Sequence, residues 1–188
     1  RGFNFIWEKG CNQMKGLIHI YTGNGKGKTT AAVGLGIRAC GRGMKVLMVQ
    51  FLKGIETGEM TIIKKLEPDF ILHRGEQLPK FTWQMNDEEK KRASKVQHEI
   101  FEFAKEAAFS GKVDLLILDE IMAAVNADFL DKNSVLDFIK NKPDNLELIL
   151  TGRNAPAEFI EKADYVSEIL DVKHPMKQGI PARKGIEY

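Results

Sequence analysis

The chain alternates between short apolar runs and longer segments in which apolar residues recur at helical spacing. Runs this short, with few polar interruptions, are typical of strands in a parallel sheet covered on both faces. Because helical segments separate them, the pattern predicts an α/β fold with a mostly parallel central sheet and helices on both faces. The expected strands lie at 17–21, 45–52, 70–72, 113–120, 146–150 and 165–170.

Helical spacing predicts helices at 28–41, 86–110 and 133–140, a short helix before residue 70, and another that Pro156 opens. Asn86 is expected to cap the longest helix, with Glu89 completing a capping box. In the helix at 28–41, Gly34 and Gly36 lower the helix propensity but permit close packing against the sheet.

One glycine-rich stretch lies between the first expected strand and the first expected helix. It contains Gly23, Asn24, Gly25, Lys26, Gly27, Lys28, Thr29 and Thr30. Closely spaced glycines let backbone N–H groups converge on a phosphate, the last lysine adds charge, and the first threonine hydroxyl can ligate Mg²⁺. Thr22 occupies the first glycine position of the general motif. The plainer interpretation is a glycine-rich turn, but strand, loop, lysine, hydroxyl and helix follow in the order of a phosphate-binding loop.

Acidic residues follow the apolar run at 113–118. Asp119 and Glu120 would emerge at the end of that strand, where Asp119 could hold Mg²⁺ and Glu120 could orient water or the metal shell. Buried strands often end in an acidic residue, so this pattern alone does not indicate a metal site. Together with the glycine-rich loop it does. Gln50 and Arg153 come at or after the ends of two other strands, on the side where ligands bind to open α/β sheets.

Four further features do not identify a function by themselves. Arg38 lies ten residues beyond Lys28, and its spacing favours an exposed surface charge. Phe81 and Trp83 either fold onto the core or form a flat apolar platform for a planar ligand. Residues 1–16 form either a disordered arm or one that covers an active site. The basic tail after residue 171 is expected to be solvated.

Composition narrows the class of protein. The 188 residues suit one domain at 17–188 after the arm, and a net charge of +2 gives no argument for nucleic acid. No apolar run reaches 18 residues, so no membrane span is expected, and residues 1–14 lack the order of a signal peptide. Cys11 and Cys40 lack metal-ligand spacing and fit reduced thiols in a cytoplasmic protein.

Several motifs together resemble one enzyme family. They are T-G-N-G-K-G-K-T-T-A-A at 22–32, V-Q-F-L-K-G at 49–54, F-T-W at 81–83, L-D-E at 118–120, T-G-R-N at 151–154, V-K-H-P at 172–175 and the closing K-G-I-E-Y. In this order they resemble the ATP:corrinoid adenosyltransferases of the cob(I)yrinic acid a,c-diamide type. The resemblance covers nearly all the chain except the arm, and it agrees with threonine at position 22.

The resemblance implies a fold like that of the RecA-like P-loop NTPases. It also implies transfer of the 5′-deoxyadenosyl group of ATP to Co(I) of a corrinoid, with release of triphosphate. Lys28 would stabilise the leaving triphosphate, Phe81 and Trp83 would activate the corrinoid, and Mg²⁺ would be held by Thr29, Asp119 and Glu120. Nucleotide contacts are expected from residues 23–30 and from Arg38, Glu59 and Arg153.

The family implies two partners, a reduced flavoprotein such as flavodoxin as electron donor and a second subunit in a homodimer. Two other classes of function stay open from the residues alone. One is a phosphotransferase or ATPase in which Glu120 positions the nucleophile and ADP is released. The other is a nucleotide-binding module without turnover.

Overall fold

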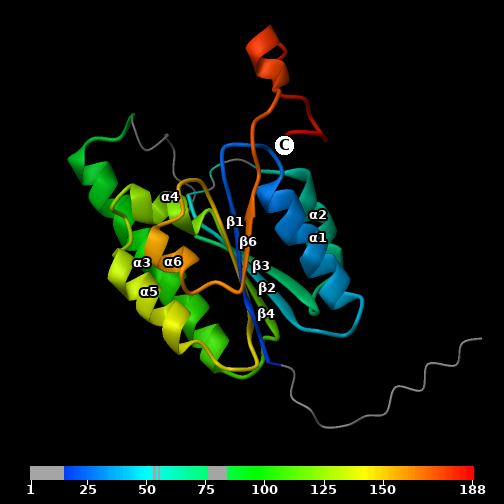
Figure 1. The fold of residues 1–188 in the computed structure, drawn as a ribbon, viewed down its shortest axis with the longest axis vertical. Helices are drawn as coiled ribbons and strands as arrows, with labels where there is room; N and C mark the ends of the chain where they lie inside the picture. The colour runs from blue at the N-terminus through cyan, green and yellow to red at the C-terminus, as the bar shows by residue number, and fades with distance from the viewer. Residues whose placement is uncertain (1–14, 53, 55, 76–83) are drawn as a thin grey trace, which may run out of the picture.

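A computed structural model describes residues 15–52, 54, 56–75 and 84–188, and Figure 1 draws the rest as a grey trace. The arm at 1–14 and the predicted corrinoid residues Phe81 and Trp83 lie outside the described residues. Six strands form one sheet: β1 (Ile18–Thr22), β2 (Val46–Gln50), β3 (Phe70–Arg74), β4 (Leu115–Asp119), β5 (Glu147–Thr151) and β6 (Tyr165–Glu168).

The described helices are α1 (Lys28–Cys40), α2 (Gly58–Lys65), α3 (Asp87–Phe109), α4 (Ile121–Asn126), α5 (Lys132–Asn141), α6 (Ala157–Ile160) and the 3₁₀ helix η2 (Pro175–Gln178). The predicted ranges of α1, α3 and α5 agree to within a few residues, and α2 and α6 lie where short helices were expected. The predicted capping box of α3 is present, since Asn86 accepts from the Glu89 N–H while the Glu89 carboxylate accepts from the Asn86 N–H. Sequence reasoning missed α4, which follows β4 directly, and η2.

All six strands are parallel, in the spatial order β3-β2-β4-β5-β1-β6. Strand β5 therefore separates β1, which leads into the glycine-rich loop, from β4, which ends in Asp119. Register places Gln50 beside Asp119 and Tyr21 beside Thr151. The parallel arrangement brings every carboxyl end to one edge of the sheet, where ligands bind in open α/β folds.

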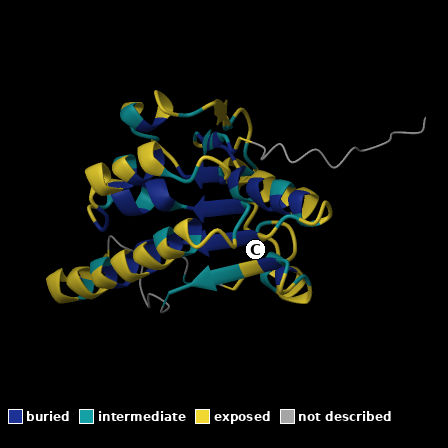
Figure 2. Ribbon diagram, turned by 90° about the horizontal axis from the view of Figure 1, so that it is seen from below, coloured by how far each residue is buried: buried dark blue, intermediate teal, exposed yellow. Residues whose placement is uncertain are grey.

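Side chains alternate between two cores, one on each face of the sheet. Leu47, Val49, Leu116 and Leu118 pack with α3, α4, α5 and α6 on one face. Residues next to them in the strands, such as Met48 and Ile117, pack with α1 and α2 on the other. Figure 1 shows the sheet between two helical layers, and Figure 2 colours its central strands as buried, so the predicted helices on both faces are confirmed.

The two glycines inside α1 have different environments. Gly36 is buried, and a Cβ there would lie 2.7 Å from the Phe70 ring, so the predicted close packing is confirmed at this position. At Gly34, which faces solvent, a Cβ would meet nothing within 4 Å. Close packing therefore explains only one of them.

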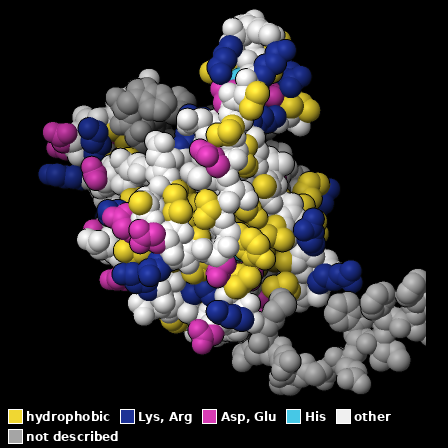
Figure 3. Space-filling model, in the orientation of Figure 1, with side chains coloured by type: hydrophobic (Ala, Val, Ile, Leu, Met, Phe, Trp, Pro, Cys, Tyr) yellow, Lys and Arg dark blue, Asp and Glu magenta, His cyan; other side chains and the backbone are white. Residues whose placement is uncertain are grey.

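Beyond β6 the chain projects past the carboxyl edge of the sheet (Figure 1). This segment carries η2 and a turn at 183–188 in which the Gly185 N–H donates to the Tyr188 carbonyl. Figure 3 shows its lysine and arginine side chains gathered on the projecting part. In the described ranges, no helix is long and apolar enough to cross a membrane.

Candidate nucleotide-binding site

The glycine-rich loop has the backbone of a phosphate-binding loop. Gly27, which precedes α1, has φ 123°, a conformation that side chains disfavour. The loop also lies against the chain beyond β6, because the Gly25 N–H donates to the Ile169 carbonyl at 2.7 Å. A Cβ on Gly25 would approach that carbonyl oxygen to 2.7 Å. The backbone conformation at Gly27 and the close contact at Gly25 therefore explain why glycine occupies these two positions.

Lys28 is the first residue of α1 and is buried. Its ammonium donates to the carbonyls of Gly23 and Gly25, both at 2.8 Å. The side chain therefore folds back over the loop, with its charge beside the N-terminus of α1. Loop amides, helix dipole and ammonium all favour an anion at this point.

Thr22, the departure from the general loop motif, ends β1 and is buried. Its carbonyl accepts from the Ile169 N–H at 2.9 Å, and its hydroxyl accepts from the Ala155 N–H at 3.3 Å. The threonine thus ties the loop to the segments after β5 and β6. Thr22 is not among the residues with positive φ, so glycine is not required there.

The Asp119 carboxylate is fully buried at the end of β4 and joins four parts of the fold. Its Oδ1 accepts from the hydroxyls of Thr29 at 2.9 Å and Thr151 at 2.7 Å. Its Oδ2 accepts from the Gln50 amide at 3.1 Å. Asp119 and Thr29, both predicted to hold Mg²⁺, therefore lie within hydrogen-bonding distance of each other, and their binding of the ion stays a prediction.

Glu120 follows in a left-handed conformation, with φ 61°, and caps α4. Non-glycine residues rarely adopt this conformation, and it recurs at functional sites. The Glu120 N–H donates to the Thr151 hydroxyl at 2.9 Å. This turn points the half-buried Glu120 side chain into the pocket beside the loop.

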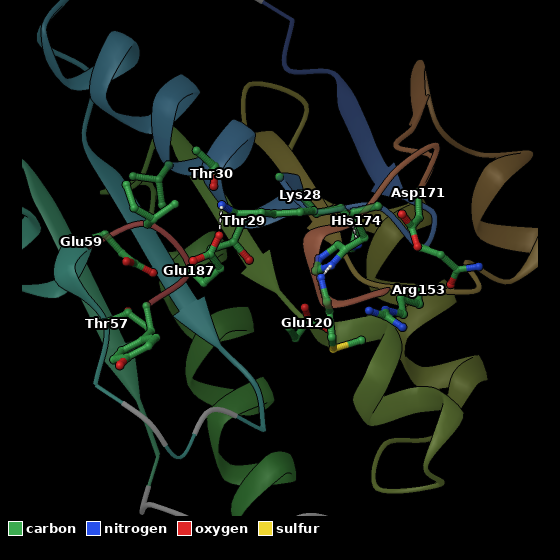
Figure 4. Close-up of a pocket in the computed structure, with 18 of the residues that line it drawn as sticks. Lys28, Thr29, Thr30, Thr57, Glu59, Glu120, Arg153, Asp171, His174 and Glu187 are labelled. Carbon is green, nitrogen blue, oxygen red and sulfur yellow. Dashed lines mark hydrogen bonds and ion pairs between the residues drawn. The ribbon is translucent and has the colours of Figure 1, made fainter. Parts of the chain in front are cut away.

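A pocket of about 610 Å³ lies over the loop at the carboxyl edge of the sheet (Figure 4). One wall consists of the loop and the start of α1, and α2 contributes Glu59 beside Thr57. Arg153 and Glu120 come from the segments after β5 and β4. The opposite wall comes from the end of the chain: Asp171, His174, Met176, Lys177, Gly185, Ile186, Glu187 and Tyr188.

Ion pairs hold this opposite wall in place. Glu187 Oε1 lies 3.2 Å from Lys26 Nζ of the loop and 3.1 Å from Arg183 Nη2. Hydrogen bonds from Arg183, with a further one from Lys26, lower the pKa of Glu187 to about 2. The Lys177 ammonium, 2.9 Å from Asp171, likewise lowers the pKa of that carboxyl. Most residues of this tail are exposed, as predicted, but the sequence did not indicate that the tail also lines the pocket.

Most of the predicted nucleotide residues line this pocket. They are Asn24, Gly25, Lys26, Gly27, Lys28, Thr29, Thr30, Glu59 and Arg153, together with Glu120 from the predicted metal set. Gly23 and Asp119 lie just behind it, through their bonds to Lys28 and Thr29. Arg38 is in the last turn of α1, about 15 Å along the helix from Lys28, and does not line the pocket. Its contact with the nucleotide stays a prediction.

The oxygen donors at the loop fit Mg²⁺. Thr29 supplies a hydroxyl and Asp119 a carboxylate, close enough to hydrogen-bond, and Mg²⁺ prefers such hard oxygen ligands with the rest from water and phosphate. Among the described residues there is no group of three or more histidine, cysteine or acidic side chains arranged around a metal.

Loop, buried acid and intervening strand define a P-loop nucleotide-binding protein of the RecA-like type. The family profile described as ATP:corrinoid adenosyltransferase BtuR/CobO/CobP matches residues 14–188, and the chain belongs to this family.

Curated relatives agree with this assignment. A corrinoid adenosyltransferase of a Sinorhizobium species is 39% identical over 180 residues, which cover 93% of this chain and 81% of that protein. The corrinoid adenosyltransferase of Escherichia coli K12 is 36% identical, covering 93% and 86%. Corrinoid adenosyltransferase CobA of Salmonella typhimurium is 34% identical, covering 95% and 88%. Among solved structures, domain III of the Thermotoga maritima replication initiation protein DnaA matches with a TM-score of 0.42 and 12% identity, covering 85% of this chain and 56% of that one.

Proposed function

We propose that the protein transfers the 5′-deoxyadenosyl group of ATP to Co(I) of a corrinoid, in the synthesis or salvage of adenosylated cobalamin. The lone pair of Co(I) forms the bond to C5′ of the ribose. The C5′–O5′ bond breaks with its electron pair on oxygen, so triphosphate leaves and the cobalt becomes formally Co(III). The observation that carries this proposal is the family match over residues 14–188.

The pocket supports this chemistry at the leaving group. Negative charge grows on the triphosphate as the bond to C5′ breaks, and groups fixed beside that charge lower the barrier. Lys28 and the loop amides would do this in the proposed reaction, and Lys26 and Arg153 add positive charge to the same pocket. The protein does not need a general base, because Co(I) already carries the reacting electron pair.

Mg²⁺ belongs to the same proposal. When bound, it would neutralise part of the charge on the triphosphate. Thr29 and Asp119 would hold it directly or through water, and Glu120 would face its shell from the end of β4. Arg38 and Glu59 are proposed as further nucleotide contacts, the latter from the first turn of α2.

The proposed reaction also needs a source of electrons for the cobalt. A corrinoid that arrives as Co(II) needs one electron before it can attack, and a reduced flavoprotein such as flavodoxin would provide it. Phe81 and Trp83 would displace the lower axial ligand, which lowers the energy of the orbital that accepts the electron. A homodimer with the arm over the site, and a cytoplasmic location, complete this proposal.

Incubation with MgATP and chemically reduced corrinoid tests the reaction. We expect the absorption spectrum of a Co–C bond and one triphosphate for each adenosylated corrinoid, measured by ion chromatography. ADP or phosphate released without corrinoid would instead favour a phosphotransferase or ATPase. Binding of both ligands without product would favour a module that only binds.

A further inference from the structure

Gln50 is a buried polar side chain that the proposed reaction does not yet use. It is the last residue of β2, is 2% exposed, and stands between Val49 and Phe51, which are fully buried. Its register partner on the neighbouring strand is Asp119. A polar side chain in such a run needs an explanation, because buried amides cost free energy unless their hydrogen bonds are made.

One of its hydrogen bonds goes to Asp119. A carboxylate only accepts hydrogen bonds, so the Gln50 side chain must turn its Nε2 toward Asp119 Oδ2, which it approaches to 3.1 Å. The Gln50 Oε1 is then left buried, and no described residue donates a hydrogen bond to it. An aliphatic side chain would avoid this cost, so contribution to the core does not explain the residue.

The bond from Gln50 separates the roles of the two Asp119 oxygens. Oδ2 faces Gln50, whereas Oδ1 accepts from the Thr29 and Thr151 hydroxyls. The last torsion of an aspartate is broad and roughly two-fold, so a carboxylate without such anchors rotates easily. Donors on both sides fix the plane of the carboxylate and keep Oδ1 directed at Thr29.

We propose that Gln50 is a positioning residue for magnesium: it holds the Asp119 carboxylate in the orientation in which Oδ1 and the Thr29 hydroxyl face one ion. Outer partners of metal-binding carboxylates orient the ligand and commonly change metal affinity about 10- to 100-fold. The proposal rests on the use of MgATP in the proposed function. It does not depend on corrinoid or on transfer.

Calorimetric titration of the full chain with ATP, once with Mg²⁺ and once with EDTA, tests this role without measuring activity. We expect Gln50→Met to weaken ATP binding about 10-fold or more in Mg²⁺ and to change it little in EDTA. Gln50→Asn keeps an amide but withdraws it by one methylene, and we expect the same selective loss. Circular dichroism verifies that each variant is folded. If Gln50→Met does not fold, Gln50→Asn tests the proposal in its place.

Gln97 offers a matched control. It is also a buried glutamine, 1% exposed, but its Oε1 accepts from the Leu52 N–H at 3.0 Å and is not bonded to Asp119. We expect Gln97→Met to leave the ratio of ATP affinities with and without Mg²⁺ as it is in the wild type.

Two results would overturn the assignment of Gln50. One is an equal loss of affinity in both buffers, which would mean a structural role. The other is unchanged binding in both buffers for a folded variant. If the wild type binds MgATP but forms no adenosylated corrinoid, the proposed function fails while the assignment of Gln50 is still tested.

Discussion

The Glu187 carboxylate accepts a hydrogen bond from the Lys26 ammonium at 3.2 Å, across 161 positions of the sequence. This pair joins the phosphate-binding loop to the projecting segment that forms the opposite wall of the pocket. Arg183 holds the same carboxylate from the other side. The wall is therefore attached to the loop by a group whose charge depends on pH.

Acidification should weaken this attachment. Because the folded pKa of Glu187 is about 2, below the usual 4.5, its contribution is complete above about pH 4.5 and is lost as the pH falls toward 2. We expect the melting temperature of Glu187→Gln to lie slightly below that of the wild type at pH 7. The two values should converge as the pH falls toward 2, and a gap that persists there would contradict the ionic role.

Removing the loop lysine should affect the leaving group. We expect Lys28→Ala to lower the rate of transfer about 100- to 1,000-fold, even with Co(I) supplied chemically, because the charge that develops on triphosphate loses its nearest cation. The rate of Co–C bond formation, followed by absorption, tests this expectation. Lys64→Ala, in the exposed last turn of α2, is the control and should behave as the wild type. A Lys28→Ala rate close to that of the wild type would remove the lysine from the chemistry.

The proposed aromatic residues should matter mainly for reduction. We expect Trp83→Ala to slow the reaction most when Co(II) corrinoid must be reduced on the enzyme by a flavoprotein. The loss should be smaller when Co(I) is supplied ready-made. Comparing the rates under the two conditions tests this, and equal losses would exclude Trp83 from the reduction step.

Two glycines of α1 give opposite predictions for stability. Gly36→Ala places a methyl group 2.7 Å from the Phe70 ring, and such overpacking costs about 1–3 kcal/mol. Gly34→Ala meets nothing within 4 Å and should stabilise the helix by about 0.5–1 kcal/mol. Urea unfolding of both variants measures the difference. Equal effects would mean that contact with Phe70 does not limit position 36.

The sequence allowed the sheet, the loop and the Asp119 strand to be predicted because each leaves a local pattern. A strand such as Leu115–Asp119 is visible as an unbroken apolar run that ends in an acid, all within five residues. Helix α4 left no such pattern, since six residues are fewer than two helical turns. Gly34 and Gly36 looked alike for a related reason, because only the packing of α1 against Phe70 distinguishes them.

The far wall of the pocket could not be predicted from local pattern. A basic, glycine-containing segment is usually exposed to solvent. The residues that flank Glu187 in the sequence do not indicate that its side chain contacts Lys26. That contact depends on the path of the chain beyond β6, which the bond from the Gly25 N–H to the Ile169 carbonyl directs past the loop. The orientation of Gln50 toward Asp119 likewise depends on strand order, because β2 and β4 are adjacent only in space.

The pocket draws on both early and late parts of the chain, from Asn24 to Tyr188. During synthesis on a ribosome, the phosphate-binding loop leaves the exit tunnel long before the segment that faces it. A nascent polypeptide can thus form the loop but cannot enclose a nucleotide until residues 171–188 have emerged. The nucleotide therefore cannot serve as a template for folding of the earlier residues, and it can be enclosed only after this late segment has packed against the loop.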